Sequence, residues 1–187
     1  TRTGYTFNGW NTQADGNGTA QAAESTFNMG SANVTLYARW TQNPTYTVSY
    51  NSNNADSGSV PTDSNNYETG QTVTVKTNSG NLARSGYSFN NWNTKADGSG
   101  TARVTGSTFT MGSANVTLYA QWRVNPTYSV TYNANSATSG SVPTDSNSYE
   151  EGATVTAANN TGNLTRTGYS FNGWNTAANG SGTSRST

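Results

Sequence analysis

The sequence predicts a mostly β fold made of small domains repeated in tandem. The composition is the first observation behind this prediction. Thr, Asn, Ser and Gly dominate the 187 residues, while 11% of the residues are aromatic and 10% are charged. Disordered chains are usually poor in aromatics and rich in charge, whereas Thr, Tyr, Val, Phe and Trp suit a pleated, half-buried strand. The second observation is an unbroken sequence period of 82 residues.

The period is carried by a nine-residue motif that occurs three times. The pattern Gly-Tyr-x-Phe-x-x-Trp-Asn-Thr occupies residues 4–12, 86–94 and 168–176, and no gap is needed to align the copies. Self-similarity at a fixed period is the sequence signature of tandem domains.

Two Asn-Pro pairs, at 43–44 and 125–126, separate the repeats. Proline cannot donate to a ladder and restricts the residue before it, so we expect short linkers around these pairs. The predicted domains are the C-terminal part of repeat 1 (1–45), a complete repeat 2 (46–127, with its linker at 123–127) and the N-terminal part of repeat 3 (128–187). We expect this chain to be a window on a longer array. The alternative is that strands are shared between neighbouring repeats or chains.

The first half of the complete repeat predicts two strands. Residues 46–50 alternate between apolar and polar side chains, which places their Tyr and Val residues on one face. A second strand is expected over 71–77, with Val73 and Val75 facing inward. A polar turn then separates this strand from Leu82, a lone apolar anchor.

The second half of the repeat begins with a strand over 86–92 that places Tyr87 and Phe89 on one face. Trp92 does not follow this alternation, so we expect a β-bulge near residues 90–91.

Phe109 and Met111 are expected in a loop or one helical turn. Residues 115–122 predict the clearest strand of the repeat. The residues expected on its inward face are Val116, Leu118, Ala120 and Trp122.

These motifs together resemble the Listeria–Bacteroides repeat, the InlB B-repeat-like module of bacterial surface proteins. The resemblance covers residues 4–40 and 86–122, resumes at 168–183, and extends to the first strands at 46–82. It implies a small α+β, β-grasp-like domain, arranged in tandem in large secreted or cell-wall-attached proteins, with no known catalytic activity and no particular ligand. Asn91 replaces the usual Gly before Trp, so we expect no strict positive-φ requirement at that position.

The sequence offers no catalytic, cofactor-binding or metal-binding residue. It contains no His and no Cys, so the commonest general base and the thiolate ligand are missing. The Asp-Gly turns at 15–18 and 97–100 carry oxygen ligands that calcium prefers, but the third copy at 179–182 has no carboxylate. Hairpin turn chemistry is therefore the favoured interpretation.

Acidic and lysine side chains give no stronger candidate. Glu150 and Glu151 are adjacent, but the other copy has the single acid Glu68. These residues, with Asp63 and Asp145, are interpreted as solvated turn acids. Lys76 and Lys95 could form isopeptide bonds with Asn, but neither lysine occurs in the other copies, so we expect no cross-link.

Aromatic residues are the remaining candidates. Trp10, Trp92 and Trp174 could stack on sugars, but aromatics at this spacing are more often core residues. Tyr37 and Tyr119 are expected to face outward, each next to a Thr on that face, and are better candidates for an adhesive surface. The glycosylation sequons at Asn33 and Asn115 are expected by chance in this composition.

We expect a non-enzymatic stalk or spacer of a bacterial extracellular or cell-surface adhesin, without a cofactor. The net charge is zero, so no basic field would attract nucleic acid. The apolar runs are too short for membrane insertion. The expected partners are neighbouring repeats and like chains, with any host or environmental ligand open. One alternative is a self-assembling extracellular filament subunit with shared strands, and the second is a glycan-binding module.

Overall fold

The computed structural model describes residues 1–186, which form strands and loops and contain no helix. The mostly β prediction is therefore confirmed. Contacts divide the chain into two units. One unit holds Thr1–Ser85 with Phe89–Arg123, and the other holds Gly86–Ser88 with the residues from Val124 onward.

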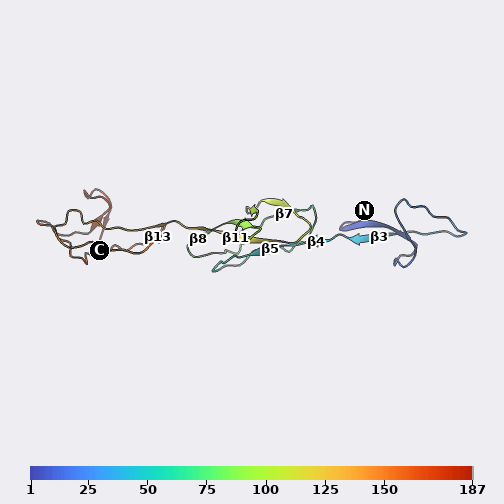
Figure 1. Ribbon diagram of the computed structural model, residues 1–187, viewed down its shortest axis with the longest axis horizontal. Helices are drawn as coiled ribbons and strands as arrows, with labels where there is room; N and C mark the ends of the chain where they lie inside the picture. The colour runs from blue at the N-terminus through green and yellow to red at the C-terminus, as the bar shows by residue number, and fades with distance from the viewer. Residues whose placement is uncertain (187) are drawn as a thin grey trace. The chain divides into compact units, whose positions relative to one another are not determined.

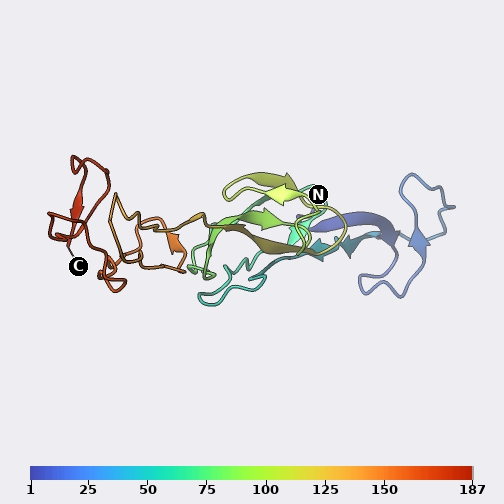
Figure 2. The same ribbon diagram turned by 60° about the vertical axis from the view of Figure 1, so that its left-hand side comes forward.

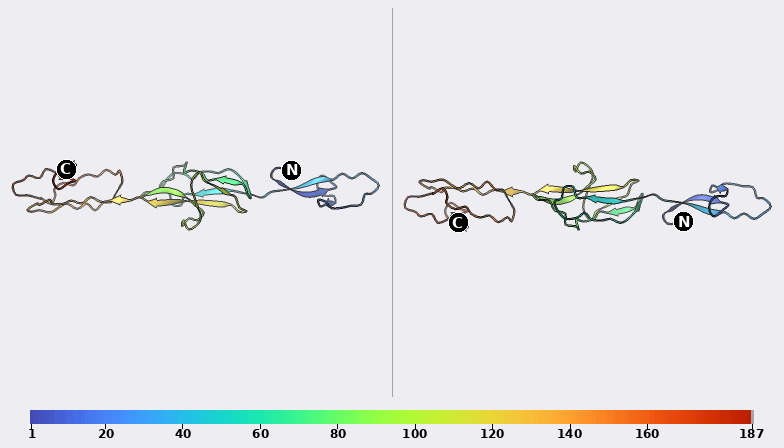
Figure 3. Two further views of the ribbon diagram at one scale, coloured as in Figure 1. Left: turned by 90° about the horizontal axis from the view of Figure 1, so that it is seen from above. Right: turned by 90° about the horizontal axis from the view of Figure 1, so that it is seen from below.

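The complete repeat contains a four-stranded sheet in the order β5-β11-β8-β9, together with the strand pairs β10-β7 and β4-β6 (Figure 1). Strands β5 and β11 run parallel, and Leu118 lies opposite Tyr50 in their register. The strands of this sheet run side by side in both views of Figure 3. The bounds are β4 (Thr45–Tyr46), β5 (Val48–Asn51), β6 (Tyr67–Glu68), β7 (Thr72–Thr74), β8 (Tyr87–Asn93), β9 (Ala102–Arg103), β10 (Thr108–Thr110) and β11 (Val116–Val124).

The core of this repeat lies where the sequence placed it. The predicted inward residues Val73, Val75 and Leu82 are buried, and Leu118 of β11 is fully buried. Burial of such side chains is the main favourable term in folding, at about 1.5–3 kcal/mol for each large one. The buried cluster comprises Val48, Tyr50, Val73, Val75, Leu82, Trp92, Met111, Leu118 and Ala120.

Two local expectations differ from the structure. Phe109 lies in strand β10, which pairs with β7, and not in a loop or a helical turn. The pairing extends to Met111, whose N–H donates to the carbonyl of Gln71 at 2.8 Å. The linkers are also narrower than expected, because Arg123 and Val124 belong to β11 and Thr127 begins the next strand.

The bulge expected near residues 90–91 is seen at the corresponding place in the first copy, and the backbone at this place varies between the copies. In the first copy the register shifts between Phe7 and Trp10, where Gly9 has φ of 93°. Gly173 has φ of 102° in the third copy, whereas Asn91 is not among the described residues with positive φ. The prediction that Asn91 needs no positive φ is therefore confirmed.

The N-terminal segment contains the second half of a repeat. Its strands form a sheet in the order β2-β1-β3 (Figure 2). Strand β3 has the position of β11 in the 82-residue period, but it lies at the edge of this sheet. The strands are β1 (Tyr5–Asn11), β2 (Ala20–Gln21) and β3 (Tyr37–Gln42).

The C-terminal segment contains the first half of a repeat and the motif strand that follows it. Short strands pair as β12-β13 and β14-β15. Residues 130–133, which correspond to β5, are not in a strand here. The strands are β12 (Thr127–Tyr128), β13 (Tyr149–Glu150), β14 (Trp174–Asn175) and β15 (Ser184–Arg185).

Candidate functional site

The first Asn-Pro junction is held on both sides by hydrogen bonds. The Asn43 N–H donates to the carbonyl of Gly4 at 2.9 Å, and the Thr6 hydroxyl donates to Asn43 Oδ1 at 2.7 Å. On the other side, Asn43 Nδ2 donates to Glu68 Oε2 at 2.7 Å. One amide side chain therefore links the motif strand of one repeat to the β4-β6 pair of the next.

The second junction repeats this arrangement. The Asn125 N–H donates to the carbonyl of Gly86 at 2.9 Å, and the Ser88 hydroxyl donates to Asn125 Oδ1 at 2.6 Å. Asn125 Nδ2 donates to Glu150 Oε2 at 2.9 Å. Glu68 and Glu150, which were predicted to be solvated turn acids, therefore each accept a hydrogen bond at a junction.

The chemistry of the junction suits a short, stiff connection. Proline fixes its own φ after each of these Asn residues, and the Asn side chain uses both its donor and its acceptor atoms. At each junction a strand ends directly before the Asn and the next strand begins directly after the Pro, so the connection consists of Asn43-Pro44 or Asn125-Pro126 alone. The junction is therefore a hydrogen-bonded element of the chain.

A Tyr–Trp pair fixes the core of the complete repeat. The Lys76 N–H donates to the Tyr50 hydroxyl at 2.8 Å, and the Trp92 indole N–H donates to the Lys76 carbonyl at 2.9 Å. The two rings meet edge-on with centroids 4.8 Å apart. Burial raises the pKa of the Tyr50 phenol, because the charged phenolate would lose its hydration there.

The same pair recurs in the C-terminal segment. The Ala158 N–H donates to the Tyr132 hydroxyl at 2.8 Å, and the Trp174 indole donates to the Ala158 carbonyl at 2.7 Å. Ala158 stands at the position that corresponds to Lys76, so both hydrogen bonds of this position are made by backbone atoms alone.

The Asn that follows each motif Trp organises the adjoining turn, a role that the sequence interpretation missed. Asn93 is 3% exposed, and its Nδ2 donates to the carbonyls of Gly98 and Gly100 at 3.0 and 3.4 Å. Its Oδ1 accepts from the Lys95 N–H at 2.9 Å. Asn11 and Asn175 make the equivalent bonds. The sequence signal for this role is the Trp-Asn-Thr triplet, which is identical in the three copies of the motif.

The Asp-Gly turns use their acids as turn acceptors. Asp97 Oδ1 accepts from the Ser99 N–H and hydroxyl, at 3.0 and 2.8 Å. These hydrogen bonds hold the pKa of the Asp97 carboxyl below its ordinary value. Asn179 makes the same two bonds to Ser181 without a charge. No group of three or more His, Cys, Asp or Glu side chains gathers within residues 1–186.

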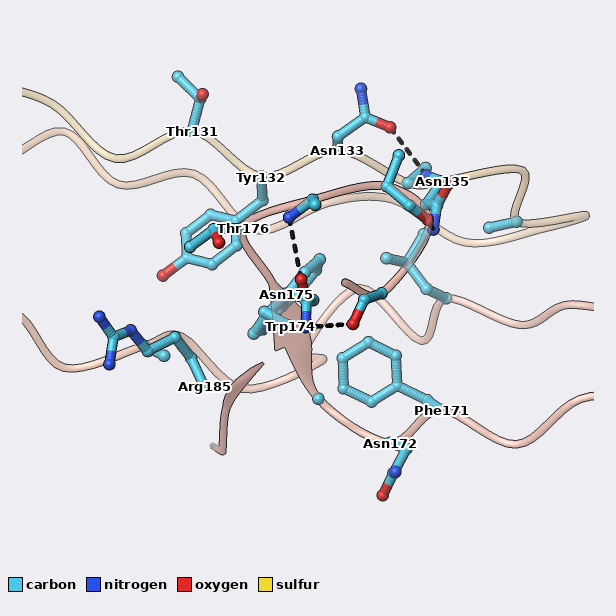
Figure 4. Close-up of a pocket in the computed structure, with 18 of the residues that line it drawn as sticks. Thr131, Tyr132, Asn133, Asn135, Phe171, Asn172, Trp174, Asn175, Thr176 and Arg185 are labelled. Carbon is cyan, nitrogen blue, oxygen red and sulfur yellow. Dashed lines mark hydrogen bonds between the residues drawn. The ribbon is translucent and has the colours of Figure 1, made fainter. Parts of the chain in front are cut away.

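A cavity of about 900 Å³ opens in the C-terminal segment (Figure 4). Trp174 forms part of its wall, between Tyr132 and Phe171, with ring centroids 4.6 and 5.1 Å away. The Asn133 and Asn135 side of the cavity is fixed by a hydrogen bond from the Asn135 N–H to Asn133 Oδ1 at 2.8 Å. The wall is thus aromatic on one side and amide-rich on the other.

The three motif tryptophans differ in exposure. Trp92 is fully buried, as predicted. Trp10 is 37% exposed, so the prediction of a core residue is wrong there, and Trp174 is half-buried in the cavity wall. The exposure of Trp10 differs from that of Trp92 because the described residues around Trp10 include no counterpart of Tyr50 or of β7 to pack against it.

The remaining candidates have diverse surroundings. Tyr37 is 42% exposed, whereas Tyr119 is half-buried. The sequon residue Asn115 accepts the Thr47 N–H at 2.9 Å, so its side chain supports the entry to β5. Asn33 is exposed. None of these residues lies in the lining of the cavity.

Comparison with known proteins identifies one family. The model of the Listeria-Bacteroides repeat domain matches residues 1–39, 46–121 and 128–187. A protein of Evansella cellulosilytica named "Putative Gly-rich membrane protein" is 44% identical over 139 residues, which are 72% of this chain and 16% of that protein. A second protein of that organism, named "Putative membrane protein", is 46% identical over 96 residues, or 51% of this chain and 14% of its own length.

The chain thus spans less than a fifth of the length of these relatives. No solved structure matches it. Residues 1–186 include no helix that is long and apolar enough to cross a bilayer.

Proposed function

Because the chain belongs to the Listeria-Bacteroides repeat domain family, with three matched segments in tandem, we propose that it is a non-enzymatic spacer segment of a bacterial extracellular or cell-surface protein. Repeats of this family occur in surface proteins, and both relatives carry the word membrane in their names. The spacer would hold an adhesive or other terminal domain away from the cell envelope.

The hydrogen-bonded Asn-Pro junction is the observation that carries this proposal. A spacer has to resist folding back on itself, and a free Gly- or Ser-rich linker between domains would behave as a flexible coil. Asn43 and Asn125 instead bond to the motif strand before them and to the Glu after them. Repeating this junction in a long array would make the length grow in proportion to the number of repeats.

Small-angle X-ray scattering of arrays built from this repeat tests the proposal. We expect the maximum dimension to rise linearly with repeat number, and the scattering to have the profile of a rod. Replacing the junction Asn by Ala at every junction, as in Asn43→Ala, is expected to broaden the distance distribution. Asn17→Ala is the matched control, because the Asn17 side chain bonds only to Asp15 within its own turn. A flexible-coil profile for the unmodified array would exclude a spacer.

A further inference from the structure

The strands at the two ends of the complete repeat lie side by side and run in the same direction. Strand β5 follows the Asn43-Pro44 junction and the short strand β4, and β11 ends directly before Asn125-Pro126. The two strands pair in parallel, with Val116 opposite Val48 where both begin. Family matches lie on both sides of this repeat. Tension along the array would therefore pull on β5 at its start and on β11 at its end.

The parallel pairing decides how tension would load the hydrogen bonds between β5 and β11. The start of one strand and the end of the other lie at opposite ends of a parallel ladder, so the two pulls act along the strands and away from each other. All bonds of the ladder are then strained together, because they are evenly spaced along the strands. Two strands pulled apart from one shared end would instead lose their bonds one after another, which needs less force.

Side-chain hydrogen bonds join the two strands at both ends of their ladder. Before β5, the Thr47 N–H donates to Asn115 Oδ1 at 2.9 Å. After β5, Asn53 Nδ2 donates to the Ala120 carbonyl at 2.7 Å. The Trp122 indole N–H donates to the Asn53 carbonyl at 2.8 Å. Sliding of β5 along β11 would therefore break these bonds together with the ladder between them.

The buried side chains of the two strands also oppose sliding. Val48 and Tyr50 of β5 belong to the same buried cluster as Leu118 and Ala120 of β11. The Tyr50 hydroxyl accepts the Lys76 N–H at 2.8 Å, which ties β5 to the segment after β7. Strand β5 is at the edge of the four-stranded sheet, so load on β5 reaches the rest of this sheet through β11. Close-packed side chains cannot pass one another without opening the core.

We propose that the complete repeat is a mechanical clamp, in which the parallel β5-β11 pair bears tension along the array. This inference rests on the proposed spacer function, because a spacer is loaded when the domain that it holds is pulled away from the cell. The clamp adds a second function to that of a spacer. The repeat stays folded under tension, so the array keeps its length while it transmits force.

Single-molecule force spectroscopy with two pulling directions tests the clamp. The chain contains no Cys, so a pair of introduced cysteines defines the two points at which the 187-residue chain is held. Thr45→Cys with Val124→Cys pulls β5 and β11 along their length, whereas Thr45→Cys with Ala114→Cys pulls them apart at one end; all three positions are exposed. Forced unfolding follows the rate of crossing the unfolding barrier, so at one loading rate we expect the first pair to need at least about twice the force of the second.

Asn53→Gly tests the side-chain bond after β5. Glycine suits the φ of 47° at this position, so the variant removes the side chain without straining the backbone. We expect a lower unfolding force along the strands and a smaller change for pulling from positions 45 and 114, because the strands then part from their other end. Asn54→Gly is the matched control and should change neither force. Asn54 is exposed, has φ of 67°, and its side chain donates to none of the described residues.

Equal unfolding forces in the two directions would overturn the clamp, and so would an equal loss of force in both directions for Asn53→Gly. These outcomes are distinct from those of the scattering experiment on arrays. A rod-like array whose repeat unfolds at equal forces would support the spacer and overturn the clamp. A coil-like array whose repeat still resists pulling along the strands would exclude the spacer and support the clamp.

Discussion

Replacing Trp92 by Phe, with Trp10→Phe as its matched partner, separates the effect of burial from the effect of sequence. Trp92 is fully buried and donates to the Lys76 carbonyl, whereas Trp10 is 37% exposed and its indole donates to none of the described residues. Leaving a buried carbonyl without its donor costs about 1–3 kcal/mol. The smaller ring adds a cavity that costs on the order of 1 kcal/mol. We therefore expect Trp92→Phe to lower the free energy of unfolding by about 2–4 kcal/mol.

Trp10→Phe should change that free energy by less than about 1 kcal/mol, because water already surrounds more than a third of the ring. Urea unfolding followed by far-UV circular dichroism measures both variants. Hydrogen exchange on peptides from residues 46–122 locates the loss. Equal effects of the two substitutions, or a loss below about 1 kcal/mol for Trp92→Phe, would refute the reasoning that burial decides.

Three further predictions follow from the hydrogen bonds of the complete repeat. Tyr50→Phe leaves the Lys76 N–H unpaired and should cost about 1–2 kcal/mol in urea unfolding. Burial raises the pKa of the Tyr50 phenol. The contribution of this group to stability is therefore complete below the pKa of about 10 in the unfolded chain, and it is lost as the pH rises through the folded pKa. The urea midpoint of Tyr50→Phe should accordingly fall less steeply in alkaline solution than that of the parent chain. Asn93→Ala removes three hydrogen bonds made by a nearly buried side chain and should lower the free energy of unfolding by about 2–4 kcal/mol. Amide hydrogen exchange should rise first in the turn at 95–100. Unchanged exchange in that turn would contradict the role assigned to Asn93. Asp97→Asn should leave the midpoint at neutral pH unchanged, because Asn179 makes the same turn bonds without a charge. The lowered pKa of Asp97 contributes stability above its unfolded pKa that is lost on acidification, so the variant should also lose less stability in acid.

Inward-facing residues and bulges could be predicted from the sequence where they follow from the spacing of residues within one strand. Strict alternation placed Val73 and Val75 inward. The three-residue spacing from Phe89 to Trp92 predicted a bulge, and the structure has one at the corresponding place in the first copy, between Phe7 and Trp10. Strand β10 was missed because Thr-Phe-Thr contains a single apolar residue, and its pairing partner β7 is distant in sequence. Long-range pairing of this kind leaves no periodic signal in a short window.

The candidate site was less predictable because its chemistry lies in polar side chains with structural roles. Asn43 and Asn93 belong to a composition so rich in Asn that neither residue stands out. Their functions depend on which carbonyls and carboxylates the fold brings near, and a buried amide is tolerated only where such partners exist. The prediction from Pro that the junctions are linkers identified the right place but missed the hydrogen bonds that Asn43 and Asn125 make there.

Nearly identical stretches of this chain adopt different structures, and the difference shows what the fold depends on. Residues 116–118 and 34–36 have the same sequence, Val-Thr-Leu, yet only the first stretch is in a strand. Met111 is 1% exposed and its counterpart Met29 is 63% exposed. Intrinsic propensity is equal in each comparison, so the neighbouring strands must decide. Within the complete repeat, the strands of the first half, β5 and β7, pair with β11 and β10 of the second half and so organise it.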